Sequence, residues 1–274
     1  MTIDEIFKRV QQLPPGLPQI AQEILLAFES NADVDLKVIA DKISQDQVIA
    51  AKVLRLANSA YFGGARNVAT LDQAVVLLGM SALRTLVVAS SATGLFPDMP
   101  GFNKEAFWKH SFQVASLSQK LAKVAGLDAN VAFMCGMLHR IGDLLIRMAN
   151  PSLSADIDSY EEMGACRAES QKNLMGLDYA EVGEALAQRW DFPEVIQQAI
   201  AHQLEPQAYE GDENYAALLA VADHLLCSAT KELDENDEEY YPEVAANLLA
   251  LSRDKVLDRL EEVMEASGEE LAVV

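Results

Sequence analysis

Four histidines are the residues of this 274-residue chain whose chemistry is most versatile: His110, His139, His202 and His224. An imidazole binds transition metals and exchanges protons near neutral pH, so histidines that meet in a fold can form a metal site or an acid–base site. The sequence holds no glycine-rich phosphate loop, no G-x-S-x-G turn and no H-E-x-x-H helix beside them. A histidine on an apolar helix is more often a hydrogen-bonded core residue than a ligand, so its sequence surroundings must decide.

The surroundings of His139 resemble a known signature. Residues 136–143 read GMLHRIGD and look like the HD superfamily, in which an apolar helix ends in a His-Asp pair followed by Ile-Gly. Further strings, in order and spacing over about residues 13–225, are similar to the HDOD family: LPPGLP at 13–18, LRLANSAYF at 54–62, LDQA at 71–74, FWKHS at 107–111, GLDYAEVG at 176–183 and WDFP at 190–193. The resemblance implies a helical N-terminal subdomain packed on an HD-like helical core, in a bacterial signalling or regulatory protein.

The resemblance also implies where a metal would bind. Catalytic relatives hold one or two divalent ions with imidazole and carboxylate ligands and hydrolyse phosphate esters, because the metal generates hydroxide and stabilises charge at phosphorus. His110 and His139 match the first two ligand histidines, and Asp223 matches the closing aspartate. These three residues are therefore the metal ligands that this chain would use if it bound a metal.

The other positions depart from the catalytic pattern. The partner of His139 is Arg140 instead of aspartate, Tyr179 stands where catalytic relatives have histidine, and His202 is followed by Gln203 where they have a second histidine. A guanidinium has five donors, no acceptor and a pKa above about 12, so it cannot ligate a cation. We therefore predict no metal and no catalytic residue, only a vestigial HD-type pocket of His110, His139, Arg140, Asp143, Tyr179, His202 and Asp223.

The sequence leaves the position of Arg140 open. A buried guanidinium can occupy the place of the cation and bridge leftover acceptors such as Asp223 or Asp143. Alternatively Arg140 faces the solvent and pairs with Asp143, which lies three residues after Arg140 and four before Arg147 on one helix. Both arrangements remove the metal.

Two other functions remain as alternatives. His110, His139 and Asp223 can still form a three-ligand site with open positions, as in a metal-dependent phosphohydrolase acting on a nucleotide or cyclic dinucleotide. In a nucleotide-sensing module, Arg140 would bind a phosphate without cleaving it, since arginine suits bidentate phosphate recognition.

Composition narrows the partners and the compartment. The formal net charge is −21, and residues 1–100 hold 10 acids against 8 bases, so most of the surplus lies in the remainder. This balance argues against nucleic-acid binding, which needs Lys and Arg to neutralise phosphates. Three widely spaced cysteines form no CxxC pair, and acids stand where a signal peptide needs bases. The apolar stretch at 74–96 is interrupted by Arg84, so we expect a cytoplasmic protein without a membrane span.

Helix signals recur throughout, without a sustained strand pattern, and predict an all-α fold. The prolines and glycine of residues 96–101 predict a boundary between a helical bundle at 1–96 and an HD-like core at 101–274. The acidic stretch at 231–239 is expected to be a solvated loop. Expected helices run from Asn103 to Gly126, from Asp128 through His139 to about Met148, from Asp178 to near Trp190, from Pro193 through His202, and over about 213–230 and 252–266.

Together these features predict a non-catalytic signal-transduction or regulatory module of HDOD type, without a cofactor, that acts through protein–protein contacts. The string NSAYFGG at 58–64 is either part of the partner surface or a helix end at which Asn58 or Ser59 bonds to the backbone.

Overall fold

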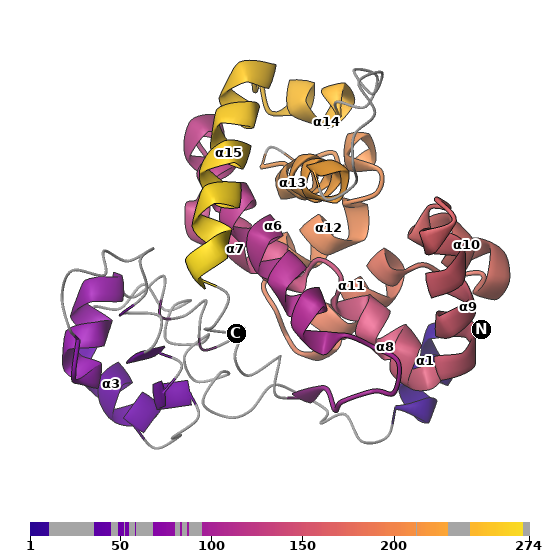
Figure 1. The fold of residues 1–274 in the computed structure, drawn as a ribbon, viewed down its shortest axis with the longest axis horizontal. Helices are drawn as coiled ribbons and strands as arrows, with labels where there is room; N and C mark the ends of the chain where they lie inside the picture. Colours follow the sequence, from indigo (N-terminus) through magenta and orange to yellow (C-terminus); the bar gives the residue numbers. More distant parts are fainter. Residues whose placement is uncertain are drawn as a thin grey trace. The chain divides into compact units, whose positions relative to one another are not determined.

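The structure is a computed structural model that describes residues 1–10, 36–44, 68–79, 95–211, 213–229 and 242–270, with a few positions between 49 and 58 and at 83 and 87. Every regular element of this described part is helical, which confirms the all-α prediction (Figure 1). The helices are α1 (Ile3–Arg9), α3 (Leu36–Ser44), α6 (Lys104–Ala125), α7 (Ala129–Leu138), α8 (Ile141–Ala149), α9 (Pro151–Glu162), α10 (Arg167–Met175), α11 (Tyr179–Arg189), α12 (Glu194–His202), the 3₁₀ turn η2 (Pro206–Ala208), α13 (Tyr215–Ala229), α14 (Glu243–Leu248) and α15 (Arg253–Glu270).

Contacts divide the chain into two compact units. One contains Met1–Gly16 and Asp98–Leu260, and the other contains Leu17–Pro97 and Glu261–Val274. This division differs from the expected 1–96 and 101–274 at both ends of the chain. The N-terminal helix α1 packs against α8 and buries Ile6 fully, and its Phe7 ring lies 4.9 Å from the guanidinium of Arg189 at the end of α11. The stretch expected to be a solvated loop, 231–239, lies outside the described residues.

Local capping signals position several of the helices that carry the site. The Asn103 side chain accepts a hydrogen bond from the Ala106 backbone at the start of α6, and Gly126 ends that helix with a left-handed φ of 76°. At the start of α11, Asp178 and Glu181 form a reciprocal capping box. The expected bounds of both helices are confirmed.

The helix expected from Asp128 to about Met148 is two helices, so that prediction was wrong. The chain breaks at His139 and Arg140, between α7 and α8. The break redirects α8 onto α11, where a Cβ at Gly142 would collide with the backbone at Tyr179 and Gly183. Tertiary packing at this close approach therefore overrides the apolar periodicity that suggested one continuous helix.

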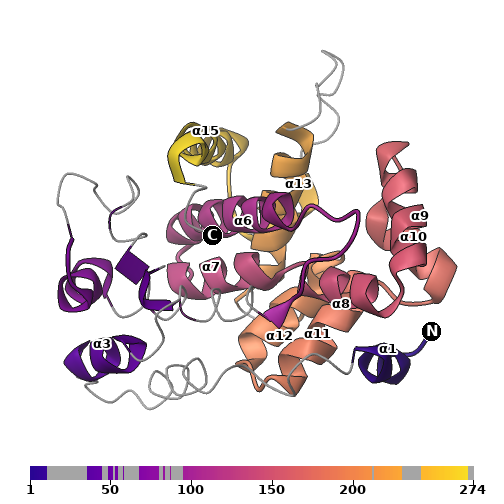
Figure 2. The ribbon, with the colours of Figure 1, turned by 60° about the horizontal axis from the view of Figure 1, so that its bottom comes forward.

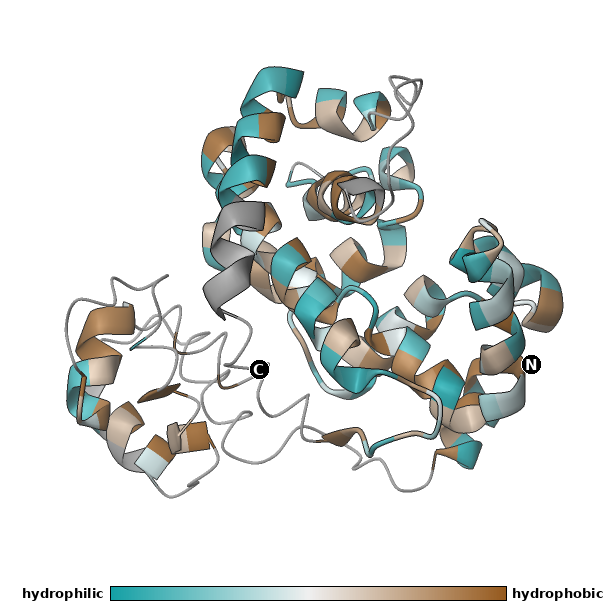
Figure 3. Ribbon diagram, in the orientation of Figure 1, coloured by the Kyte–Doolittle hydropathy of each residue, from teal (hydrophilic) through white to brown (hydrophobic). Residues whose placement is uncertain are grey.

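The core of the larger unit lies where α6, α7 and α13 meet. Figure 2 shows α6 and α7 side by side, and α13 packs against both. In Figure 3 α13 is mostly hydrophobic, whereas the first part of α15 is mostly hydrophilic. The segment Ala129–Ala149 is long and apolar enough to cross a membrane, but 72% of an apolar 18-residue stretch within it is buried in the structure. A buried helix pair of this kind is typical of a protein core.

Candidate functional site

Three of the predicted ligand residues meet in space. His110 lies on α6, His139 directly follows α7, and Asp223 lies on α13, so the packing of these helices brings the three together. One ligand atom from each residue lies within 4.8 Å of the other two. His139 is fully buried, and the side chains of His110 and Asp223 remain about one-fifth exposed, at 21% and 23%. We call these three residues the His–His–Asp cluster.

Asp223 is the centre of the cluster. Its Oδ1 lies 2.6 Å from His110 Nε2 and 3.3 Å from His139 Nε2. Burial raises the pKa of the Asp223 carboxyl, but the neighbouring imidazoles of His110 and His139 lower it more, so the pKa lies well below its usual range. Asp223 is therefore ionised, with His110 as its close hydrogen-bond partner, whereas His139 Nε2 at 3.3 Å can donate to it only when that ring carries both protons.

The buried position of His139 fixes its protonation. Burial lowers the pKa of His139, and the nearby Asp223 carboxylate offsets only part of that effect. Its Nδ1 lies 2.7 Å from the Gly136 carbonyl oxygen, which can only accept a hydrogen bond, so Nδ1 carries the proton. In the neutral ring Nε2 is then unprotonated and faces Asp223. This tautomer also occurs in metal-binding histidines.

Arg140 is buried, as in the first of the two arrangements considered from the sequence, but its contacts are with Tyr179 and Glu161. Its side chain is only 15% exposed, with the guanidinium 5.5 Å from the centre of the Tyr179 ring and 3.7 Å from Glu161 Oε1. Burial disfavours its charge, but the Asp143 and Asp223 carboxylates raise the pKa of Arg140 above its usual value. A buried, permanently protonated guanidinium therefore lies close to the cluster without forming an ion pair with Asp143 or Asp223.

Asp143 belongs to a buried ion-pair network that Glu161 joins to Arg140, because Glu161 pairs with both Arg140 and Arg167. Its Oδ1 accepts hydrogen bonds from Arg167 Nε at 2.8 Å and from Gln171 Nε2 at 2.7 Å. The helix neighbour Arg147 instead binds Asp158 through two hydrogen bonds of 2.7 Å. The partners of Asp143 and Arg147 lie on α9 and α10, which contact α8 only in the folded chain. The spacing of residues along α8 therefore could not indicate these partners.

Tyr179 and Gln203 fill the positions of two missing histidines without reaching Asp223 through a described hydrogen bond. Tyr179 is buried at the start of α11, and burial raises the pKa of its hydroxyl, so the ring stays neutral. Gln203 donates from Nε2 to the His139 and Ile200 carbonyl oxygens, both at 2.8 Å. Gln203 therefore fixes the backbone that carries His139.

His202 points elsewhere. Its ring lies 5.8 Å from the ring of Tyr209, and both residues line a pocket beside α12. The structure therefore places His202 outside the His–His–Asp cluster. His224, next to Asp223 on α13, is partly exposed and is not part of the cluster.

Cys227 is a neighbour of the cluster that sequence reasoning missed. Its Sγ lies 3.8 Å from Asp223 Oδ1 and 3.9 Å from His110 Nε2. The spacing of four residues places Asp223 and Cys227 on one face of α13, so the helical period would have indicated this neighbour once Asp223 was chosen.

The chain matches the model of the HDOD domain over residues 14–206. It belongs to the HDOD family. A crystal structure of a Shewanella amazonensis protein named "Putative phosphohydrolase" is 35% identical to this HDOD chain, with a TM-score of 0.78 over 97% of this chain and 96% of that one. An HDOD domain protein of unknown function from Geobacter sulfurreducens has a TM-score of 0.79 at 24% identity, with 97% and 96% covered.

Curated relatives are longer than this HDOD chain. An uncharacterized protein of Treponema pallidum is 29% identical over 243 residues, which are 87% of this chain but 46% of that protein. Ribonuclease Y of Thermus thermophilus is 32% identical over 138 residues, which are 50% of this chain and 19% of that enzyme. The chain thus spans less than half the length of either relative.

Proposed function

We propose that this HDOD chain is a non-catalytic cytoplasmic signalling module that acts through contacts with protein partners. The buried guanidinium of Arg140 is the observation that carries the proposal. It follows His139 directly, where catalytic relatives of the superfamily have an aspartate, and its positive charge opposes any cation bound at the adjacent cluster.

The spacing within the cluster also supports a site without a metal. Ligand atoms around one tetrahedral ion lie about 1.6 times the metal–ligand distance apart, which gives roughly 3.3 Å for nitrogen and oxygen ligands. His139 Nε2 and Asp223 Oδ1 have that spacing, at 3.3 Å. His110 Nε2 and Asp223 Oδ1, at 2.6 Å, are closer than two ligands of one ion and have the length of a charge-assisted hydrogen bond.

A metal-dependent phosphohydrolase is the second candidate. The convergence of His110, His139 and Asp223 and the unprotonated Nε2 of His139 favour it. These three residues would hold the ion, which would supply a Lewis acid and an activated water. Against it stand Arg140 and the two positions at which Tyr179 and Gln203 replace histidine ligands.

Hydrolysis assays separate the two candidates. We expect the full chain to show no turnover of bis(p-nitrophenyl) phosphate or of a cyclic dinucleotide with added Mn²⁺, Fe²⁺ or Zn²⁺, beyond that of the metal alone. The matched pair is the natural chain and Arg140→Asp, and we expect only the variant to gain a metal-dependent thermal shift, because it restores a carboxylate beside His139. Turnover by the natural chain that His139→Ala abolishes would establish the enzyme instead.

The signalling part of the proposal is tested by recovering the tagged chain, after crosslinking, from the bacterium that encodes it. We expect a protein partner in stoichiometric amount, recovered equally by His139→Ala because the contact needs no metal. Recovery of the chain alone would contradict protein-mediated signalling.

A further inference from the structure

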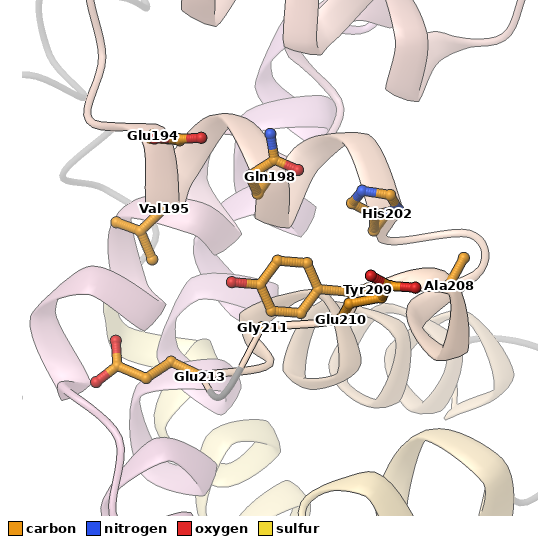
Figure 4. Close-up of a pocket in the computed structure, with 9 residues that line it drawn as sticks. All are labelled: Glu194, Val195, Gln198, His202, Ala208, Tyr209, Glu210, Gly211 and Glu213. Carbon is orange, nitrogen blue, oxygen red and sulfur yellow. The ribbon is translucent and has the colours of Figure 1, made fainter.

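A pocket of about 630 Å³ lies between α12 and the loop that connects η2 to α13 (Figure 4). Its volume is within the range of sites that hold small molecules or side chains. Glu194, Gln198 and His202 form one wall, and their four-residue spacing places them on one face of α12. Tyr209 and the segment that follows it form the opposite wall.

The aromatic part of the pocket is held in place by packing. The rings of His202 and Tyr209 lie 5.8 Å apart, tilted by 49°. A Cβ at Gly211 would collide with the hydroxyl and ring of Tyr209, so the absence of a side chain there allows the ring to lie against the loop. Tyr209 therefore presents a fixed ring beside α12.

The charge of the pocket is uniformly negative. Glu194, Glu210 and Glu213 line it, and its described lining contains neither lysine nor arginine. None of these three glutamates forms an ion pair with another residue of the described part of the chain, in contrast to Glu161, which pairs with Arg167 at 2.6 Å. Unpaired carboxylates around an aromatic ring attract a cation by direct charge and by the quadrupole of the ring.

We propose that this α12 pocket binds a guanidinium or ammonium group, presented as an arginine or lysine side chain by a protein partner. The lining glutamates are exposed, so a side chain on a large molecule can enter without any movement of α12. The inference rests on the proposed function in one respect, that the partner is a protein. It names the chemistry by which that partner is recognised.

The test uses the full chain and a blocked pentapeptide with a central arginine among glycines, measured by calorimetry. The control peptide carries citrulline, which has nearly the same shape without the charge. We expect saturable binding of the arginine peptide, weaker at high salt, and at least tenfold weaker binding of the citrulline peptide, which corresponds to about 1.4 kcal/mol.

Matched variants locate the binding. The pocket triple removes the charge of the lining glutamates: Glu194→Gln, Glu210→Gln and Glu213→Gln. We expect this triple to bind the arginine peptide at least tenfold more weakly than the natural chain does. The control triple removes the same amount of charge from exposed glutamates outside the pocket: Glu105→Gln, Glu162→Gln and Glu169→Gln. It should change the affinity for the arginine peptide less than twofold.

Equal binding of both peptides, equal effects of the two triples, or no saturation with either arginine or lysine peptides would overturn the assignment. Spermidine that binds more tightly than the peptides, with the same dependence on the pocket glutamates, would overturn the protein source of the cation. The metal and hydrolysis measurements test the His–His–Asp cluster, whereas the peptide measurements test the α12 pocket. A negative result with the peptides is therefore distinguishable from a failure of the proposed function.

Discussion

Replacing Asp143 by alanine should strongly destabilise the larger unit. Asp143 and Arg167 are 2% and 6% exposed, and the change leaves the Arg167 Nε and the Gln171 amide without the acceptor that both now use. Removing one partner of a buried ion pair costs about 3–5 kcal/mol. Arg167 keeps its hydrogen bonds to Asp158 at 2.8 Å and to Glu161 at 2.6 Å, so we expect the lower end, about 3 kcal/mol.

The assay is urea denaturation followed by circular dichroism, with the dependence on urea fitted for each protein. Glu169→Ala is the matched control, because it removes an exposed carboxylate from α10 and should change the free energy of unfolding by no more than about 0.5 kcal/mol. The slope with urea should be the same in all three proteins, which shows that the unfolded states are comparable. A loss below about 1 kcal/mol for Asp143→Ala would refute a buried, essential Asp143–Arg167 pair.

Two further predictions concern the same unit. Burial raises the pKa of Asp158, but hydrogen bonds from Arg147 and Arg167 lower it more, so the pKa in the folded chain is below the unfolded value of about 3.9. Asp158 therefore stabilises the fold fully above the unfolded pKa, and this stabilisation is lost as the pH falls through the folded pKa. Urea denaturation between about pH 5 and pH 2 should show a smaller acid-dependent loss in Asp158→Asn, and an unchanged loss would contradict the pairing. Gly142→Ala should cost about 3 kcal/mol or prevent folding, because its methyl group meets the backbone at Tyr179. An unchanged melting temperature would show that α8 and α11 do not approach so closely.

Local signals account for the parts of the fold that were predicted. Asn103 and Asp178 cap their helices through short-range hydrogen bonds, and Gly126 adopts the left-handed conformation that ends α6. The Asn58 side chain likewise forms hydrogen bonds with the backbone of Leu54 and Val68. This is the arrangement expected if the NSAYFGG string is a helix end. Ser59 lies outside the described residues. Signals of this kind are readable because they involve residues close in sequence.

Two residues of the predicted pocket have partners that the sequence pattern did not indicate. Asp143 had arginines at helical spacing on both sides, yet it binds Arg167, 24 residues away, because α10 buries the pair. His202 follows the order of the family strings, but its ring lies 5.8 Å from the ring of Tyr209, and both residues line the α12 pocket. The resemblance located the His–His–Asp cluster itself, although the spacing of its members in the sequence carries no such information.

Metal content of the purified chain is the most direct test of a non-catalytic HDOD module. The full chain is purified without chelator from cells supplied with iron, manganese and zinc, and its metals are measured by inductively coupled plasma mass spectrometry beside His139→Ala. We predict far less than one ion per chain, with no difference between the two proteins. One ion per natural chain that His139→Ala loses would contradict the account, because Arg140 would then fail to exclude the metal from the cluster.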